Sequence, residues 1–154
     1  VSAFLLNRSS DLLVIEDICV FYKKQCLYNP QKTQGHKPVN SYTKYLKTVN
    51  KTEIYGKCTK ELSGGGETDR FPRNRITFAS DKQTSYLHPT QKPLALIEYL
   101  VKTYTNENDT VLDFTMGSGT TGVACKKLNR KFIGIEKEEK YFNIAKERIE
   151  KYEN

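Results

Sequence analysis

The chain has 154 residues, of which 37% are hydrophobic and 28% are charged, and it carries a formal net charge of +7. This length suits one domain and is too short for two well-packed ones, and no apolar run approaches the length of a membrane span. The four cysteines form no Cys-x-x-Cys pair, and only two histidines are present. The sequence therefore predicts a cytoplasmic protein with reduced thiols, no membrane partner and no metal site.

The amino-terminal half combines one predicted strand with a long basic segment. An apolar run predicts a strand near residues 17–22. Between Tyr22 and Lys60 there are nine lysines, five tyrosines and a single acid, and three consecutive glycines, residues 64–66, follow soon after. We expect residues 25–70 to be a loop-rich excursion from the main fold.

Two interpretations of this basic segment are equally supported. Lysines interleaved with aromatic side chains suit phosphate contacts and base stacking, whereas a solubilising loop would have the same composition. Under the first interpretation we expect a nucleic-acid surface that includes five cationic residues. These are Lys23, Lys24, Arg70, Arg73 and Arg75.

The next stretch predicts a strand and then a helix. A strand is expected near residues 75–79, after the two arginines of Phe71-Pro-Arg-Asn-Arg75. The segment His88-Pro-Thr-Gln-Lys-Pro93 leads into a helix expected over residues 93–104, with Pro93 in its first turn and Thr90 as a plausible cap. A helix start explains these two residues but not His88, Gln91 or Lys92.

Residues 110–136 read as strand, glycine turn, helix, strand and acidic residue. We expect strands near residues 110–114 and 131–135, with a helix at 120–128 between them. Gly117 and Gly119 permit a tight turn close to a ligand. Glu136 follows the second strand, which is where a doubly wound sheet binds a nucleoside cofactor.

The glycine spacing alone does not identify that cofactor. Gly117-x-Gly119-x-x-Gly122 with a downstream carboxylate also satisfies the dinucleotide pattern. Asp113 favours a cationic ligand, because a carboxylate about 4 Å from a diphosphate charge is repelled by roughly 4 kcal/mol at an effective dielectric of about 20. The alternatives are an NAD site, or an aspartate that caps the next turn and a glutamate at a solvated strand end.

A final amphipathic helix is expected over residues 138–151. Because few residues follow Glu136, any larger sheet must be completed by strands that lie earlier in the chain, unlike the usual order of a dehydrogenase. We therefore predict an α/β fold that contains part of a doubly wound, Rossmann-like sheet.

Taken together, the motifs resemble a known enzyme family. His88-Pro-Thr-Gln-Lys-Pro93, Asp113-Phe-Thr-Met-Gly-Ser-Gly-Thr-Thr121 and Gly134-Ile-Glu136, in this order, resemble S-adenosylmethionine-dependent DNA methyltransferases that modify adenine N6 or cytosine N4. The order is that of the β class, in which the catalytic motif comes first and the cofactor motifs close the chain. The resemblance is strong over residues 71–151 and weaker over 11–31.

This resemblance implies S-adenosylmethionine as cofactor and double-stranded DNA as partner. Asp113 would face the amino-acid end of the cofactor, Glu136 would bind its ribose, and the Thr90-Gln91-Lys92 turn would close over its carboxylate. The glycine turn would wrap the cofactor, so the predicted binding set also includes Met116, Gly117, Ser118, Gly119 and Thr120. One departure is that Phe114 and Thr115 follow Asp113, where the family often has Pro and Phe.

A larger departure concerns catalysis. The family grips the flipped base with a tetrapeptide of Asp, Asn or Ser, two prolines and an aromatic residue, and no two prolines are adjacent here. The sequence therefore predicts no catalytic residue in this chain, and suggests the carboxyl-terminal part of a methyltransferase whose amino-terminal part is missing. The alternatives are a catalytically silent protein that binds S-adenosylmethionine and DNA, or, with less support, an NAD-dependent enzyme.

Overall fold

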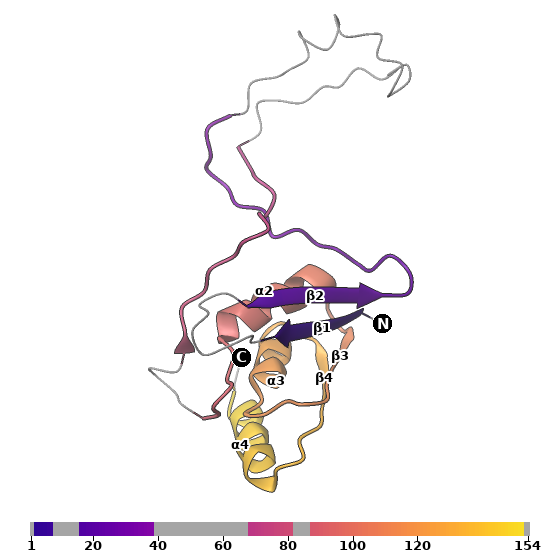
Figure 1. Ribbon diagram of the computed structural model, residues 1–154, viewed down its shortest axis with the longest axis vertical. Coiled ribbons are helices and arrows are strands. Elements are labelled where there is room, and N and C mark those ends of the chain that lie inside the picture. The colour runs from indigo at the N-terminus through magenta and orange to yellow at the C-terminus, as the bar shows by residue number, and fades with distance from the viewer. Residues whose placement is uncertain (1, 8–15, 39–67, 82–86, 153–154) are drawn as a thin grey trace, which may run out of the picture. The chain divides into compact units, whose positions relative to one another are not determined.

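The computed structural model describes residues 2–7, 16–38, 68–81 and 87–152, and for residues 2–7 it describes the backbone only (Figure 1). The chain forms two compact units, one of residues Val1–Pro30 with Thr77–Asn154 and the other of residues Gln31–Ile76. The predicted insertion at 25–70 largely coincides with the second unit, but residues 25–30 belong to the first. Most of that insertion, residues 39–67, lies outside the described residues.

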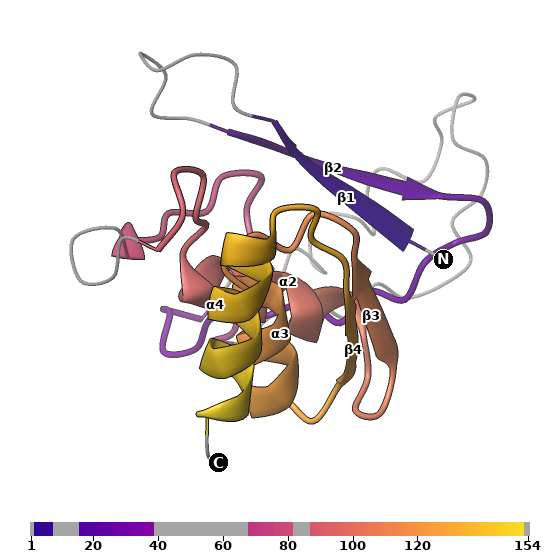
Figure 2. The same ribbon diagram turned by 90° about the horizontal axis from the view of Figure 1, so that it is seen from below.

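The first unit is a mixed α/β structure, as the sequence predicts. Its parallel strands β3 (Thr110–Asp113) and β4 (Lys131–Gly134) are joined by helix α3 (Thr120–Lys127). Helix α2 (Leu94–Tyr104) and helix α4 (Glu139–Glu150) both contact α3 (Figure 2). All five predicted elements are confirmed, with boundaries that differ by no more than one residue.

The core lies where α2 and α3 meet one face of the β3–β4 pair. Its buried residues are Ile97, Val101, Ala124 and Cys125, with Leu94, Val111, Leu128 and Phe132 packed around them. The alternation of the strands sends Val111 and Phe132 toward the helices. On the opposite face Leu112 and Ile133 are more than half exposed, at 57% and 53%, so the described helices cover only one side of this sheet.

A separate antiparallel pair was only half predicted. Strand β2 (Asp17–Tyr22) has the predicted bounds, but it pairs with β1 (Ser2–Asn7), from Ser2 opposite Tyr22 to Asn7 opposite Asp17. No strand was predicted for residues 2–7. In the part of the chain that the structure describes, these two strands and the β3–β4 pair are separate sheets.

The strand predicted near residues 75–79 is wrong. This segment has no regular secondary structure, since no described strand pairs with it. Its apolar residues are used for packing instead, and the ring of Phe78 lies 5.8 Å from the ring of Tyr99 on α2. The predicted strand is thus a segment that packs an aromatic side chain against a helix.

Both ends of α2 are stabilised by residues distant in sequence. At the start, the backbone N–H of Leu94 donates to Asp81 Oδ2 over 2.6 Å. Thr90, the predicted cap, does not cap this helix, because its hydroxyl contacts His88. At the end, the side-chain amide of Asn29 donates to the carbonyl oxygens of Lys102 and Thr105.

The described part of the second unit consists of two chain segments, 31–38 and 68–76, linked by an antiparallel bridge. Thr33 and Arg70 exchange two backbone hydrogen bonds of 2.9 Å. Lys32 pairs with Asp69 at 2.8 Å, and its ammonium lies 4.4 Å from the centre of the Phe71 ring. The guanidinium of Arg70 donates to the carbonyl oxygens of Lys37 and Asp69.

Among the residues that the structure describes, no helix combines the length and the apolar character needed to cross a membrane.

The burial of Cys125 predicts an unreactive thiol. Burial raises the pKa of this thiol to about 12, and the thiolate is the species that alkylating reagents modify. We expect iodoacetamide near neutral pH to label exposed Cys19 and partly exposed Cys26 in the folded protein and to spare Cys125, as measured by mass spectrometry of peptides. Denaturant should make all of these thiols reactive, and labelling of Cys125 as fast as Cys19 without denaturant would contradict the described core.

Candidate functional site

The site is built around the turn between β3 and α3, in which two glycines adopt left-handed backbone conformations. Gly117 has φ of +53° and Gly119 has φ of +77°, a region that disfavours residues with a side chain. The N–H of Gly119 donates to the carbonyl of Met116, and the N–H of Met116 donates to Ile135 after β4. The turn is therefore tied to the ends of both parallel strands.

The predicted binding residues of the turn are themselves buried. Met116, Ser118 and Thr120 have exposed fractions of 8%, 3% and 6%. Their side chains support the turn from within the protein, so a ligand would meet mainly the backbone here.

Asp113 lies at the end of β3 and accepts one hydrogen bond from the turn that follows and one from the first turn of α3. Its Oδ1 accepts from the N–H of Thr115 at 3.1 Å, and its Oδ2 accepts from the hydroxyl of Thr121 at 2.6 Å. The local capping role considered for this aspartate is thus present. It fixes the direction of the carboxylate and leaves further oxygen lone pairs for a ligand.

Glu136 binds the same turn from the end of β4. Its Oε2 accepts from the N–H of Gly117 at 2.8 Å, and its Oε1 accepts from the N–H of Glu138 at 3.0 Å. The hydrogen bond from Glu138 is the main cause that lowers the pKa of Glu136, and the N–H of Gly117 acts in the same direction against the effect of burial. The group is therefore a carboxylate at neutral pH, fixed beside the glycine turn.

The segment before α2 lies against the glycine turn. A β-carbon placed on Gly117 would lie 3.5 Å from the ring of His88, and that ring packs edge-on against Tyr141 of α4 with 4.2 Å between centres. His88 Nδ1 accepts from the N–H of Thr90, and the buried amide of Gln91 accepts from the N–H of Leu87. The structure thus brings His88, which sequence reasoning left unexplained, to the turn.

The side chain of Lys92, the last of the three residues predicted to close over the cofactor, contacts another part of the protein. Lys92 forms an ion pair with Glu16, next to β2. Of the three residues predicted to close over a cofactor carboxylate, Thr90 is exposed, Gln91 is buried and Lys92 is paired. Among them, Thr90 is the residue with an accessible side chain beside His88.

Helix α4 lies directly beneath the turn. A β-carbon on Gly119 would lie 2.8 Å from Cβ and 3.0 Å from Cα of Ala145. One helical turn later, Arg148 Nη1 donates to Ser118 and Thr120. Burial lowers the pKa of Arg148, while the charge of Asp81 raises it.

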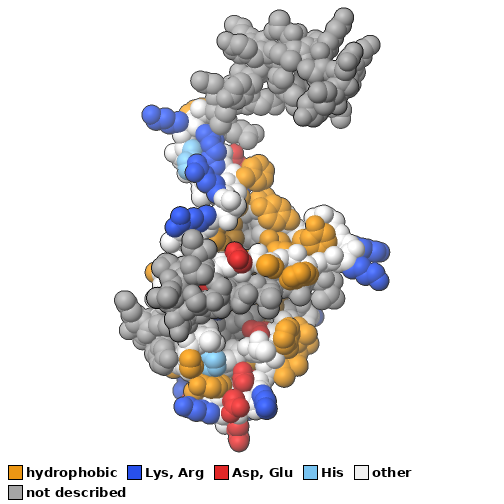
Figure 3. All heavy atoms as spheres, viewed as in Figure 1, with side chains coloured by type: hydrophobic (Ala, Val, Ile, Leu, Met, Phe, Trp, Pro, Cys, Tyr) orange, Lys and Arg blue, Asp and Glu red, His pale blue; other side chains and the backbone are white. Residues whose placement is uncertain are grey.

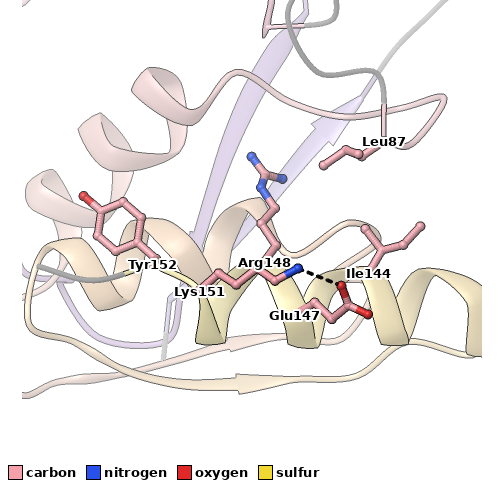
Figure 4. A pocket seen from close by; sticks show the side chains of 6 residues that line it. All are labelled: Leu87, Ile144, Glu147, Arg148, Lys151 and Tyr152. Carbon is pink, nitrogen blue, oxygen red and sulfur yellow. Dashed lines mark hydrogen bonds and ion pairs between the residues drawn. The ribbon is translucent and has the colours of Figure 1, made fainter.

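Two open cavities border α4. The larger, of about 450 Å³, is lined by Leu87, Ile144, Glu147, Arg148, Lys151 and Tyr152. Figure 4 shows Arg148 projecting from the helix, with Lys151 and Glu147 paired one turn apart. The smaller, of about 210 Å³, includes Met116 and Gly134 in its lining. Met116 is thus the only predicted cofactor residue that lines either cavity.

The predicted nucleic-acid residues fall in both units. Lys23 and Lys24 are exposed immediately after β2, and Arg73 and Arg75 are exposed in the second unit. Basic side chains gather along the described part of that unit (blue in Figure 3). Arg70 differs from the others, since it is half-buried and bonds to backbone carbonyl oxygens.

Three residues that sequence reasoning did not place at the site are His88, Tyr141 and Arg148. The unexplained histidine before Pro89 was a local signal for the first. Tyr141 and Arg148 lie in the predicted last helix, and nothing local distinguishes Arg148 from the other cations of that helix.

Comparison with known proteins gives one family and several relatives. A family model described as "N6_N4_Mtase: DNA methylase" matches residues 2–147. Type II methyltransferase M2.LlaDCHI of Lactococcus lactis subsp. cremoris is 45% identical over 92 residues, which cover 60% of this chain and 34% of that protein. Type II methyltransferase M.HpaI of Haemophilus parainfluenzae is 34% identical over 130 residues, covering 77% of this chain and 41% of that protein. The chain thus spans between a third and two-fifths of the length of these two relatives.

Solved structures give similarities of limited extent. The crystal structure of the M1.HpyAVI-SAM complex is 49% identical, covers 52% of this chain and 42% of that chain, and has a TM-score of 0.45. The cytosine-N4-specific PvuII DNA methyltransferase is 25% identical, covers 55% and 33% of the two chains, and has a TM-score of 0.47.

The contact between the turn and α4 predicts different effects of two matched substitutions. Both glycines have positive φ, so Gly117→Ala and Gly119→Ala should each cost about 1 kcal/mol in conformational energy. Only at Gly119 would the new methyl group overlap Ala145, which should cost a further 1–3 kcal/mol or so. Urea unfolding followed by circular dichroism measures both, and equal losses of stability would contradict the close approach of α4.

Proposed function

Since this chain belongs to the N6/N4 DNA methylase family, we propose that it forms the cofactor-binding part of a site-specific DNA methyltransferase. The enzyme would transfer a methyl group from S-adenosylmethionine to the exocyclic amino group of adenine (N6) or cytosine (N4). The observation that carries this proposal is the convergence of Asp113, Glu136 and His88 on one glycine turn.

The charges of the site suit this cofactor. Asp113 and Glu136 place two carboxylates at the ends of neighbouring parallel strands, and the backbone N–H of Gly117 already binds one of them. A sulfonium and an α-ammonium are attracted to these charges, whereas a diphosphate would be repelled by several kcal/mol at contact distance. This difference favours S-adenosylmethionine over NAD.

The roles follow the contacts of each residue. Glu136 would accept hydrogen bonds from the ribose hydroxyls through its remaining lone pairs, and Asp113 would bind the ammonium end. Thr90, exposed beside His88, would contact the carboxylate. The buried side chains of Ser118 and Thr120 would keep the turn in shape and would not touch the cofactor.

Held by Asp113 and Glu136, the bound cofactor would supply an electrophilic methyl group for transfer to the exocyclic nitrogen. The tetrapeptide that grips the target base is absent from this sequence, so the proposal assigns binding and alignment of the methyl donor to these residues. We expect little or no methyl transfer by this chain alone. A radiolabelled assay on unmodified duplex DNA tests that expectation, and efficient transfer would require a different catalytic group.

DNA is the proposed macromolecular partner. Exposed Arg73 and Arg75 suit phosphate contacts, and so do Lys23 and Lys24 on the other unit. Arg70 would contribute to DNA binding indirectly. Its guanidinium donates to the carbonyl oxygens of Lys37 and Asp69 and so links the two described chain segments of the second unit.

Calorimetry with S-adenosylhomocysteine tests the cofactor assignment. We expect binding by the unmodified chain, at least about tenfold weaker binding by Asp113→Asn and Glu136→Gln because each removes a charged acceptor, and no binding of NAD. Glu107→Gln is a matched control, because it removes an exposed carboxylate from the turn before β3. Binding of NAD in preference to S-adenosylhomocysteine would replace this proposal with the dinucleotide alternative.

Salt dependence tests the DNA surface separately. The double variant Arg73→Ala, Arg75→Ala should weaken binding to duplex DNA and reduce the slope of log affinity against log salt by about 2, because each phosphate contact contributes about 0.9. Fluorescence anisotropy measures both quantities.

The control removes the same total charge from α4, with Lys140→Ala and Lys146→Ala, both exposed. An equal loss of slope in the control would show that net charge, and not the arginine pair, determines DNA binding.

A further inference from the structure

One face of α4 contacts the second half of the glycine turn and the first turn of α3. Arg148 and Ile149 follow Ala145 by three and four residues, so both lie on the same side of the helix as Ala145. Ala145 is fully buried under Gly119, and Ile149 lies where a side chain on Gly122 would be. Arg148 is the only one of the three that offers hydrogen bonds.

The guanidinium of Arg148 donates to atoms on both sides of Gly119. Its Nη1 lies 3.2 Å from the backbone carbonyl oxygen of Ser118, 3.4 Å from the hydroxyl of Ser118 and 3.1 Å from the hydroxyl of Thr120. These acceptors are in buried residues, where unsatisfied polar atoms are costly. One nitrogen therefore fixes the residue before the second left-handed glycine and the residue after it.

This position is electrostatically unfavourable for a cation considered alone. Arg148 is half-buried, and it contacts Thr120, the first residue of α3, where the helix dipole is positive. A partly desolvated cation at such a place requires compensating acceptors. Ser118 and Thr120 supply them, and the charge of Asp81, which caps α2, acts in the same direction.

We propose that Arg148 is a positioning residue for cofactor binding, which holds the Ser118–Thr120 segment so that the glycine turn keeps its binding shape. This inference rests on the proposed function, because it assumes that the turn binds S-adenosylmethionine. Arg148 acts through the turn and from beneath it, so its removal changes cofactor affinity without the loss of a direct contact.

The test compares three variants of the chain. Arg148→Met keeps the apolar stem and removes the donors, whereas Arg148→Lys keeps the charge but replaces the guanidinium with a single amine. Lys151→Met is the matched control, because it removes a cation from the same cavity rim, and its ammonium is 3.1 Å from Glu147 and not on the turn.

Affinity for S-adenosylhomocysteine is measured by calorimetry at a temperature at which all three variants are folded, so that a loss of stability alone does not change it. We expect Arg148→Met to bind at least about tenfold more weakly, Arg148→Lys to be intermediate, and Lys151→Met to match the unmodified chain. If Arg148→Met does not fold, the loss of affinity in Arg148→Lys tests the proposal. Unchanged affinity in the folded Arg148 variants would overturn the proposal.

A spectroscopic measurement without ligand separates this proposal from the proposed function. In amide NMR spectra, the signals of Ser118, Gly119 and Thr120 should shift in the Arg148 variants while those of core residues Ala124 and Val101 stay in place. If the unmodified chain fails to bind S-adenosylhomocysteine, the proposed function fails. The NMR shifts would still test whether Arg148 positions the turn, and unchanged amide signals of Ser118, Gly119 and Thr120 would refute that role.

Discussion

The structure depends on a turn that only glycine can make easily. Between β3 and α3 the chain reverses through two left-handed positions, Gly117 and Gly119. The stabilising contacts come from three other segments: the carboxylate of Glu136, the ring of His88, and Ala145 with Arg148 on α4. The candidate site is the place at which these segments meet.

Local sequence patterns were sufficient for the elements that form this turn. β3 and β4 are short apolar runs, the connecting helix has its own apolar face, and the glycines mark the reversal between them. Since the parallel pairing of β3 with β4 follows from a strand, helix and strand in succession, the positions of Asp113 and Glu136 at neighbouring strand ends could also be predicted. The proximity of these acids required no contact between distant parts of the chain.

Features that depend on distant contacts were missed. β1 exists because β2 pairs with it, and residues 75–79 are not a strand because no described strand pairs with them. Asn29 and Asp81 stabilise opposite ends of α2 from 73 and 13 residues away. Arg148 looks like any cation on an amphipathic helix until α4 is placed under the turn, because its partners are 28 and 30 residues earlier.

Acidic and basic side chains contact the glycine turn from different elements, and this arrangement affects which ligands the turn can bind. Asp113 and Glu136 are fixed by N–H and O–H donors of the turn and of the segments next to it. Ligand binding would therefore require little further ordering of these carboxylates. Arg148 lies on the side of α4, and its positive charge is balanced by Asp81 and by buried oxygen atoms. Two carboxylates thus lie at the ends of neighbouring strands, which in the proposed function favours a cationic methyl donor over a diphosphate. In the proposed function, the turn would therefore contribute both its shape and this arrangement of charge to cofactor binding.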